Sequence, residues 1–407
     1  MGKIAFFNIP AWGHLSPTLP VVRELVQRGE TVHYYISEEY ADRVSETTGA
    51  EIRNVPRRVD FPVNKLPRSI LALGSLLLQQ SALWLPEALP QIKEEQYDVV
   101  LYDRVCCWGR FVSELLSIPA MGSYCTVFGM LPKEPMGPIG LRFIVPEVLD
   151  FPMYFKMRSA ARTLKKQYNL DRLGMLDLLT NVGEKNIVFT SRELLPFGEK
   201  VGPDFRFVGP CFFDRGNMGD VPFDDEDTRP IVYVSLGTVV DDAPAFYRAC
   251  LNAFKDEPIR VYMSIGRKTA VEEVGEIPSN FIVRNFMPQI EILKRAKLFI
   301  SHGGLGSVQE SLYYNVPLLM WTQNPEHAWN ARCVVDNGAG EILTQSDLAA
   351  TRLLDRVRTA LNNSTLQAKA TALGESMRQA GGQIAAVEEI QNFVQKHTAP
   401  PLTPAGS

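Results

Sequence analysis

The stretch from Leu298 to Tyr314 constrains the fold of this chain more than any other. A short apolar run, residues 298–301, precedes the glycine-rich segment His302-Gly303-Gly304-Leu305-Gly306, which leads into residues of helical composition. This order predicts a buried strand, a tight turn and a helix over residues 307–314 that begins with Ser307 as its N-cap. Such a unit is typical of a parallel α/β sheet that binds ligands beyond the ends of its strands.

The predicted turn has the chemistry of an anion-binding site. At the start of a helix the backbone N–H groups, here those of residues 304–308, lack intrahelical partners, and the helix dipole adds positive potential. Glu310 follows one turn later, where a carboxylate suits the hydroxyls of a ribose. The pattern therefore predicts a site for a nucleoside diphosphate. The alternative is a purely structural turn with His302 as a core histidine, and the turn alone does not separate the two.

The N-terminal segment predicts a βαβ unit of the doubly wound kind. An apolar strand over residues 4–9 is followed by a loop that contains His14. A helix then runs to Gly29, with Ser16 expected as N-cap and Pro17 as its first residue, and a second strand spans residues 31–36. The loop with His14 therefore lies at the carboxyl edge of the sheet, where ligands bind.

His14 and Asp103 are both expected at this edge. Asp103 ends a buried strand over residues 97–102, and the carboxyl ends of parallel strands meet at one side of a sheet. A carboxylate that orients an imidazole and stabilises its protonated form makes a general base for a hydroxyl group. The pair is a candidate catalytic dyad, and the alternative is that His14 is a structural loop histidine.

Residues 284–331 resemble the donor signature of family 1 glycosyltransferases in order and spacing. The matching elements are Phe286-x-Pro288-Gln289, His302-x-Gly304-x-Gly306-Ser307-x-x-Glu310, Pro317 and Glu326-His327. The resemblance covers nearly the whole chain and is to bacterial macrolide and flavonoid glycosyltransferases that use UDP-sugars. It implies the GT-B architecture, an α/β fold with two facing Rossmann-like doubly wound domains.

The resemblance also implies the roles of individual residues. His14 and Asp103 take the positions of the catalytic dyad. Phe286 would stack on uracil, with Gln289 at the base or ribose. Glu310 would bind the ribose hydroxyls, with His302 and Ser307 at the pyrophosphate. The full donor-binding set is Gly237, Thr238, Phe286, Gln289, His302, Gly304, Gly306, Ser307, Glu310, Trp321, Glu326 and His327.

Two positions depart from the pattern of the family. Glu326-His327 replaces the usual Asp-Gln or Glu-Gln that meets the hydroxyls of the donor sugar, and Thr322 replaces a common proline after Trp321. A neutral imidazole has one donor and one acceptor on opposite sides of its ring, whereas an amide presents both together. UDP-glucose is the expected donor, and the substitution leaves galactose or another hexose as the alternative.

An acceptor pocket is expected in the first domain. Residues 69–89 form a leucine-rich helical segment, and residues 124–157 combine aromatic residues and methionines with proline and glycine, which offers adaptable apolar surface. Core packing is the alternative for both segments. The predicted acceptor contacts are Trp12, Leu77, Trp84, Tyr124, Phe128 and Met130.

Length and composition fit two domains of similar size. The chain has 407 residues, of which 45% are hydrophobic, and a formal net charge of −4 without a basic block, which argues against nucleic-acid binding. The expected division is a first domain at 1–212, a linker at 213–229, a second domain at 230–380, a helix at 381–397 that returns to the first domain, and a disordered tail at 398–407. The acidic run at residues 224–227 is expected to be a solvated face rather than a metal site.

The cellular context is expected to be the cytoplasm. Six cysteines without CxxC spacing indicate free thiols, and the N-terminal apolar run is too short for a signal peptide. The leucine-rich segment is interrupted by polar residues, so no transmembrane segment is expected. The expected partners are a UDP-sugar and a hydrophobic hydroxylated small molecule, with neither a cofactor nor a metal.

The predicted reaction is inverting transfer of a hexose from a UDP-sugar to a flavonoid, macrolide, terpenoid or similar acceptor. Three alternatives remain open. A nucleotide-sugar epimerase shares the architecture, whereas an NAD-dependent oxidoreductase is disfavoured because the first turn, PAWGHLS, lacks GxGxxG spacing. The third is a non-catalytic partner that activates another transferase, against which the intact His14 and Asp103 argue.

Overall fold

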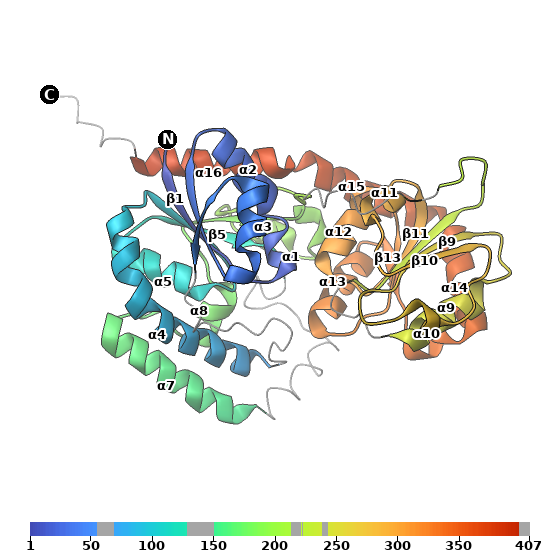
Figure 1. Ribbon diagram of the computed structural model, residues 1–407, viewed down its shortest axis with the longest axis horizontal. Helices are drawn as coiled ribbons and strands as arrows, with labels where there is room; N and C mark the ends of the chain where they lie inside the picture. The colour runs from blue at the N-terminus through green and yellow to red at the C-terminus, as the bar shows by residue number, and fades with distance from the viewer. Residues whose placement is uncertain (55–68, 128–149, 213–220, 222, 238–242, 399–407) are drawn as a thin grey trace. The chain divides into compact units, whose positions relative to one another are not determined.

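The structure is a computed structural model, and it describes residues 1–54, 69–127, 150–212, 221, 223–237 and 243–398 (Figure 1). The chain divides into two compact units. The first comprises residues 1–189, 199–213 and 380–407, and the second comprises residues 190–198 and 214–379. We describe each unit by itself.

Residues 190–198 belong to the second unit, although we expected them in the first domain. Two contacts with that unit explain the difference. Ser376 Oγ donates a hydrogen bond of 2.9 Å to Ser191 Oγ, and Asn337 Nδ2 donates one of 3.2 Å to the Leu194 carbonyl.

The first unit is built on a parallel sheet in the order β3-β2-β1-β4-β5-β6-β7. The strands are β1 (Lys3–Phe7), β2 (Thr31–Ile36), β3 (Glu51–Asn54), β4 (Val99–Asp103), β5 (Ala120–Tyr124), β6 (Lys185–Val188) and β7 (Phe205–Phe207). The order proceeds outward from β1 in one direction and from β4 in the other. The boundary between β1 and β4 is therefore the topological switch point, where ligands bind in doubly wound sheets.

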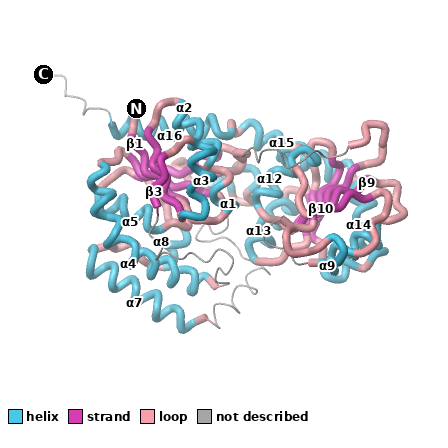
Figure 2. Tube along the Cα trace, in the orientation of Figure 1, coloured by secondary structure: helices cyan, strands magenta, loops and turns pink. Residues whose placement is uncertain are grey.

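Helices cover both faces of this sheet (Figures 1 and 2). They are α1 (Trp12–Leu15), α2 (Leu19–Gln27), α3 (Glu38–Thr48), α4 (Ile70–Glu95), α5 (Cys107–Leu116), α7 (Phe151–Tyr168), α8 (Met175–Thr180) and α16 (Gly382–Thr398). Alternate residues of β1 point into two different cores. Phe7 packs with α4, α5 and α7, whereas Phe6 packs with α2 and α16. This alternation is the pattern of a strand buried on both faces.

The C-terminal helix α16 is part of the first unit. Its apolar face, which includes Val387, Ile390 and Phe393, joins the core beside α2 (Figure 1). The backbone N–H of Gly382 donates to the Val208 carbonyl at 2.6 Å, which fixes where this helix begins.

The first helix differs from the prediction. Ser16 is the C-cap of the short helix α1, and α2 begins at Leu19 after Thr18 as N-cap. His14 therefore lies in a helical turn rather than in an open loop. The physical reason is the second proline, Pro20, three residues after Pro17. Proline lacks an N–H donor and therefore fits the first turn of a helix, and Pro20 occupies that turn in α2.

The second unit repeats this topology with a parallel sheet in the order β10-β9-β8-β11-β12-β13. The strands are β8 (Ile231–Ser235), β9 (Arg260–Ser264), β10 (Phe281–Arg284), β11 (Ala296–Ser301), β12 (Leu318–Met320) and β13 (Gly340–Ile342). Its switch point lies between β8 and β11.

The helices of the second unit are α9 (Pro244–Phe254), α10 (Val271–Val274), α11 (Gln289–Leu293), α12 (Leu305–Tyr313), α13 (Pro325–Asp336), α14 (Ala350–Leu361) and α15 (Ser364–Gln379). Short 3₁₀ turns of this unit are η2 (Arg192–Leu194) and η4 (Gln345–Leu348), whereas η3 (Gly198–Lys200) lies mostly in the first unit. Residues from β8, β9 and β11 pack with α9 and α14 in one apolar core. No helix in the described part of either unit is long and apolar enough to cross a membrane.

The predicted N-cap at Ser307 is also wrong. Gly304 is the N-cap, with an extended backbone, and α12 begins at Leu305, so Ser307 is the third helical residue. The Val308 N–H already donates to the Gly304 carbonyl at 3.0 Å. The backbone donors of the predicted cradle are therefore the N–H groups of residues 305–307, ahead of Val308.

Candidate active site

Each unit brings some of its predicted site residues to its own switch point. In the first unit, β1 and β4 are neighbours with Phe7 opposite Tyr102, so the segment after β1 lies beside Asp103, the last residue of β4. In the second, β8 and β11 end together at Ser235 and Ser301. His302 directly follows the end of β11, and Gly237 lies two residues after the end of β8.

His14 and Asp103 form a close pair. His14 Nδ1 lies 2.8 Å from Asp103 Oδ2, and the side chains are 18% and 0% exposed. The other carboxylate oxygen, Oδ1, accepts a hydrogen bond of 2.8 Å from the Val105 N–H. Because an ionised carboxylate only accepts, this geometry places the proton on Nδ1, so that Nε2 carries the basic lone pair. The arrangement is that of a general base oriented by an acid.

The predicted acceptor contacts are mostly core residues. Leu77 is 3% exposed and Trp84 is 1% exposed, and both pack in the core that covers one face of the first sheet. Tyr124 is 1% exposed and its hydroxyl donates to the Thr180 carbonyl at 2.5 Å. These side chains fill the interior, so core packing replaces the pocket-wall interpretation for all three.

The remaining predicted acceptor contacts differ in position. The ring of Trp12, in α1, is partly buried and lies under the guanidinium of Arg43, 3.8 Å from the ring centroid. This cation–π contact fixes the indole beside His14. Phe128 and Met130 lie outside the described residues.

Glycines shape the cradle around His302. A Cβ atom on Gly304 would lie 2.4 Å from His302 Nε2, and one on Gly237 would lie 2.5 Å from His302 Cε1. Gly237 also has a φ of 73°, which glycine adopts without strain. The imidazole therefore packs directly against the two turns that follow β8 and β11. Thr238, also predicted here, lies outside the described residues.

His302 is held as a neutral imidazole. Its side chain is 6% exposed, and burial lowers its pKa to about 3, with His327 as a second cause. The rings of His302 and His327 meet edge to face, with centroids 4.5 Å apart and planes at 84°. Within the described chain, Nδ1 of each ring has no hydrogen-bond partner. A neutral ring at this position offers hydrogen bonds without carrying charge.

Gln289, Ser307 and Glu310 gather on the first two turns of α12. Gln289 Nε2 donates to Glu310 Oε2 at 2.6 Å and lies 3.5 Å from Ser307 Oγ. Gln289 is 7% exposed and Glu310 is 4% exposed, so this contact is buried. Three predicted donor residues from two helices thus form one polar cluster.

The aromatic donor residues have different surroundings. Phe286 is 38% exposed, with the Arg267 guanidinium 5.5 Å from its ring centroid. Trp321 instead stacks on Phe246, with centroids 4.8 Å apart and planes at 6°. One face of its indole is therefore occupied by a protein ring.

Asn324 contributes to the site and was missed by the sequence analysis. As the N-cap of α13, its Oδ1 accepts from the His327 N–H at 2.8 Å, and its Nδ2 lies 3.1 Å from His327 Nε2. His327 is 5% exposed, and Glu326 precedes it in the first turn. The order Asn324-Pro325-Glu326 is an N-cap, a proline and an acid, a helix-start signal that would have identified this residue.

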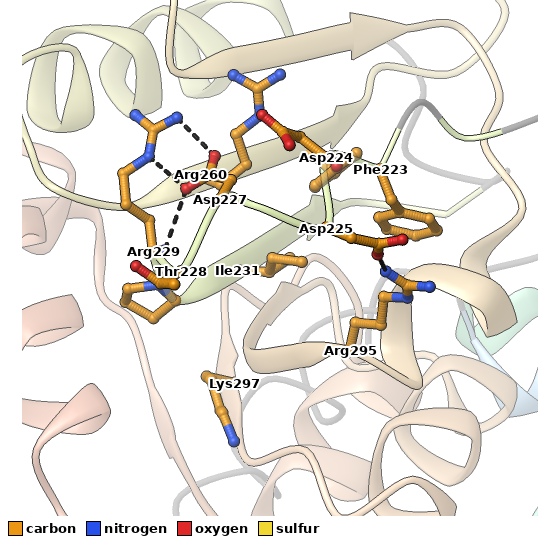
Figure 3. Close-up of a pocket in the computed structure, with 12 residues that line it drawn as sticks. Phe223, Asp224, Asp225, Asp227, Thr228, Arg229, Ile231, Arg260, Arg295 and Lys297 are labelled. Atoms are coloured by element: carbon orange, nitrogen blue, oxygen red, sulfur yellow. Dashed lines mark hydrogen bonds and ion pairs between the residues drawn. The ribbon is translucent and has the colours of Figure 1, made fainter.

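A cavity of about 240 Å³ lies elsewhere in the second unit, at the amino ends of β8, β9 and β11 (Figure 3). The predicted acidic run forms part of its lining. Asp227 pairs with Arg229 at 2.6 Å, and Asp225 pairs with Arg295 at 2.5 Å. These acids are therefore neutralised by neighbouring arginines. In the described ranges, no three His, Cys, Asp or Glu side chains form a group that would hold a metal ion.

Comparisons with known proteins find similar chains. Residues 254–388 match a family model described as the C-terminal domain of proteins like erythromycin biosynthesis protein CIII. The uncharacterized UDP-glucosyltransferase YojK of Bacillus subtilis (strain 168) is 31% identical over 98% of this chain and 99% of its own length. The oleandomycin glycosyltransferase of Streptomyces antibioticus is 29% identical over 95% of this chain and 90% of its own length.

Solved structures match over the same extent. The glycosyltransferase of kitacinnamycin superimposes with a TM-score of 0.83 at 28% identity, covering 96% of this chain and 98% of that one. The calicheamicin glycosyltransferase CalG4 superimposes with a TM-score of 0.81 at 24% identity, covering 98% and 100%. Both matches extend over both units.

Proposed function

The chain belongs to the family 1 glycosyltransferases of GT-B fold, and on this premise we propose that it transfers a hexose from a UDP-sugar to a hydroxyl group of a hydrophobic small molecule, with inversion at the anomeric carbon. The observation that carries the proposal is the 2.8 Å contact between His14 Nδ1 and Asp103 Oδ2 at the switch point of the first unit. This contact orients His14 as a base at the edge of the first sheet where ligands bind.

The donor is proposed to bind the second unit. Glu310 accepts from the ribose hydroxyls, Gln289 meets the base or ribose, and Phe286 stacks on uracil. The diphosphate lies at the start of α12, where the N–H groups of residues 305–307 and His302 donate to it. In support, the buried Gln289–Glu310 pair and the close packing of His302 on Gly304 keep these groups preformed.

The chemical step follows from these positions. His14 Nε2 takes the proton of the acceptor hydroxyl as its oxygen forms a bond to the anomeric carbon, and Asp103 stabilises the resulting imidazolium. The bond between that carbon and the diphosphate oxygen breaks on the opposite face, and UDP leaves with the electron pair. The helix N-terminus and His302 stabilise the charge on the leaving group. An α-linked donor therefore gives a β-glycoside.

We propose that this transfer needs no metal ion. The positive end of α12 and its N–H donors act on the diphosphate, which is the task that a divalent cation performs in other nucleotide sites. Turnover measured with EDTA and with added Mg²⁺ tests this point. Equal rates are expected, whereas loss of activity in EDTA that Mg²⁺ restores would contradict it.

The acceptor is proposed to be a natural product such as a macrolide, flavonoid or terpenoid. The oleandomycin relative, named for a macrolide, supports this class. UDP-glucose is the first candidate donor. Glu326 and His327 at the sugar-reading position leave galactose or another hexose open.

The experiment is a matrix of nucleotide sugars against phenolic, macrolide and terpenoid acceptors, with products identified by mass spectrometry. Purified enzyme should release UDP and form a glycoside only when an acceptor is present, and His14→Ala should form almost none. Conversion of the sugar without an acceptor would indicate an epimerase. Absence of transfer by the purified chain with every donor would favour a non-catalytic partner.

A further inference from the structure

A buried polar cluster lies between the first sheet and the turn that carries His14. Its four members are Asn8 directly after β1, Thr18 at the start of α2, Tyr34 in β2 and Cys125 directly after β5. Their exposed fractions are 1%, 0%, 0% and 7%. The sequence analysis assigned none of them to the site, and the catalytic step above does not use them.

Two of these side chains hold the backbone of His14 itself. Asn8 Nδ2 donates to the His14 carbonyl at 3.3 Å, and Cys125 Sγ donates to the same carbonyl at 3.2 Å. The next carbonyl, that of Leu15, accepts from Thr18 Oγ1 at 2.8 Å. The last two carbonyls of α1 are therefore bound by side chains from three different elements.

The directions of the hydrogen bonds in this cluster are all determined. Asn8 Oδ1 accepts from the Ile9 N–H at 2.8 Å, which orients the amide so that Nδ2 faces the cluster. Asn8 Nδ2 then donates to Tyr34 Oη at 2.7 Å. Because Thr18 Oγ1 donates to the Leu15 carbonyl, it accepts from Tyr34 Oη, 2.8 Å away. One chain of donors thus runs from Asn8 through Tyr34 and Thr18 to the His14 turn.

The helix that this cluster supports is weak by itself. α1 has four residues, Trp12–Leu15, and its N-cap Ala11 makes no side-chain cap hydrogen bond. A Cβ atom on Gly13 would meet nothing within 4 Å among the described residues, so the turn lacks close packing at that point. A single helical turn is not stable in isolation. Its geometry therefore depends on the side chains that bind its carbonyls.

We propose that Asn8, Thr18, Tyr34 and Cys125 are positioning residues that fix the α1 backbone and thereby aim the His14 imidazole at Asp103 and at the acceptor hydroxyl. This inference rests on the proposed role of His14 as the base. Its physical basis is that a catalytic group misplaced by about 1 Å loses on the order of 100-fold in rate. A fully satisfied buried network is the kind of support that holds such a group rigidly.

Tyr34→Phe is the primary test, because it removes the central hydroxyl and keeps the ring. Tyr35→Phe is the matched control. Tyr35 is the next residue of β2, is 6% exposed, and its hydroxyl lies 2.9 Å from the Tyr97 hydroxyl in the core on the other face of the sheet. Both variants lose one buried tyrosine hydroxyl, and only Tyr34→Phe removes a link to the His14 turn.

Turnover, UDP affinity and thermal unfolding are measured for both variants. Tyr34→Phe should lower kcat by about tenfold while UDP affinity stays unchanged, and Tyr35→Phe should keep kcat within about twofold at a similar unfolding midpoint. Equal kcat in the two variants would overturn the proposal. The proposal would also be overturned if Tyr34→Phe lowered UDP affinity and left kcat unchanged.

Cys125 provides a second test that does not depend on the tyrosine. Cys125→Ala removes one of the two donors to the His14 carbonyl, whereas Cys125→Ser keeps a donor at that position. The alanine variant should lose several-fold in kcat, and serine should restore most of it. Equal kcat in the alanine and serine variants would contradict a positioning role for this residue.

His14→Ala separates the two possible failures. If it retains full turnover, the proposed function of the dyad fails, and the positioning role fails with it. If His14→Ala is inactive while Tyr34→Phe matches Tyr35→Phe, only the positioning role is rejected.

Discussion

Each unit carries a histidine at its switch point, but the two histidines follow different strands and have opposite chemical settings. In the first unit His14 follows β1, and Asp103 ends the neighbouring strand β4. In the second unit the strand that corresponds to β1 is β8, which is followed by Gly237, while His302 follows β11. One imidazole thus faces a carboxylate, and the other packs against glycines.

The different neighbours of the two histidines suit them to different chemical roles. In the proposed reaction, the Asp103 carboxylate, 2.8 Å from His14, stabilises the imidazolium that forms when His14 takes a proton. His302 has an imidazole neighbour, His327, and burial holds its pKa at about 3, so it stays neutral. His14 is suited to change charge during the reaction, whereas His302 is suited to hydrogen bonding at constant charge. The predictions below test this division.

Removing the base of the first unit should have the largest effect. His14→Ala should lower kcat by about 100-fold or more, because general-base catalysis contributes about 10²–10⁴. Asp103→Asn keeps the shape of the partner and loses its charge, so kcat should fall by a smaller factor. Steady-state assays with saturating donor measure both. Wild-type turnover in the two variants would show that the dyad assignment is wrong.

Removing a donor contact of the second unit should affect binding instead of chemistry. Glu310→Ala deletes the buried carboxylate that Gln289 contacts at 2.6 Å, and we expect UDP affinity to fall about tenfold. Glu291→Ala is the control, since Glu291 lies on the surface of α11 in an ion pair with Lys294. Calorimetry with UDP alone reports both values. Equal UDP affinities for the two variants would show that the nucleotide does not bind at Glu310.

The buried neutral state of His302 should make stability depend on pH. In the folded protein its pKa is about 3, lowered from 6.5, so between these values the unfolded chain binds a proton that the folded chain does not. Folding stability should therefore fall as pH decreases from about 6.5 toward 3, by at most about 1.4 kcal/mol per pH unit from this group. Urea unfolding at pH 7 and pH 5 should show a smaller decrease for His302→Asn than for wild type. Equal decreases in unfolding free energy for the two proteins would contradict a buried neutral His302.

The sugar-reading position should give the smallest effect. His327→Gln replaces a ring bound to Asn324 by an amide that presents a donor and an acceptor together, and selectivity for UDP-glucose over UDP-galactose should rise. One hydrogen bond is worth about 0.5–1.5 kcal/mol, which corresponds to a few-fold to about tenfold change in the ratio of kcat/KM. Competition between equal concentrations of the two donors measures it. An unchanged ratio would show that His327 does not contact the donor sugar and only packs against His302.

Much of the fold could be predicted because strand ends and glycine turns are local signals. The predicted strands at residues 31–36 and 231–235 coincide with β2 and β8, and the edge that holds Asp103 follows from parallel topology. Helix starts were predicted less well. Ser16 and Ser307 have the composition of N-caps, but Thr18 and Gly304 take that position because the preceding turns set the backbone there.

The rest of the site depends on contacts between residues far apart in the sequence. Leu77 and Trp84 have the composition of a pocket wall, and only the packed structure shows them in the core. Cys125 reaches the His14 carbonyl across 111 positions of the chain, which no local pattern indicates. Thr238, Phe128 and Met130 lie outside the described residues and remain predictions.

UDP titration of His14→Ala and His302→Ala, side by side in one calorimeter, tests the division of labour between the two histidines most directly. His14→Ala should bind UDP with wild-type affinity, because its role begins with the acceptor proton. His302→Ala should bind UDP about tenfold more weakly, because it loses a buried hydrogen-bonding group at the diphosphate. Wild-type affinity in His302→Ala, or a matching loss in His14→Ala, would contradict the account.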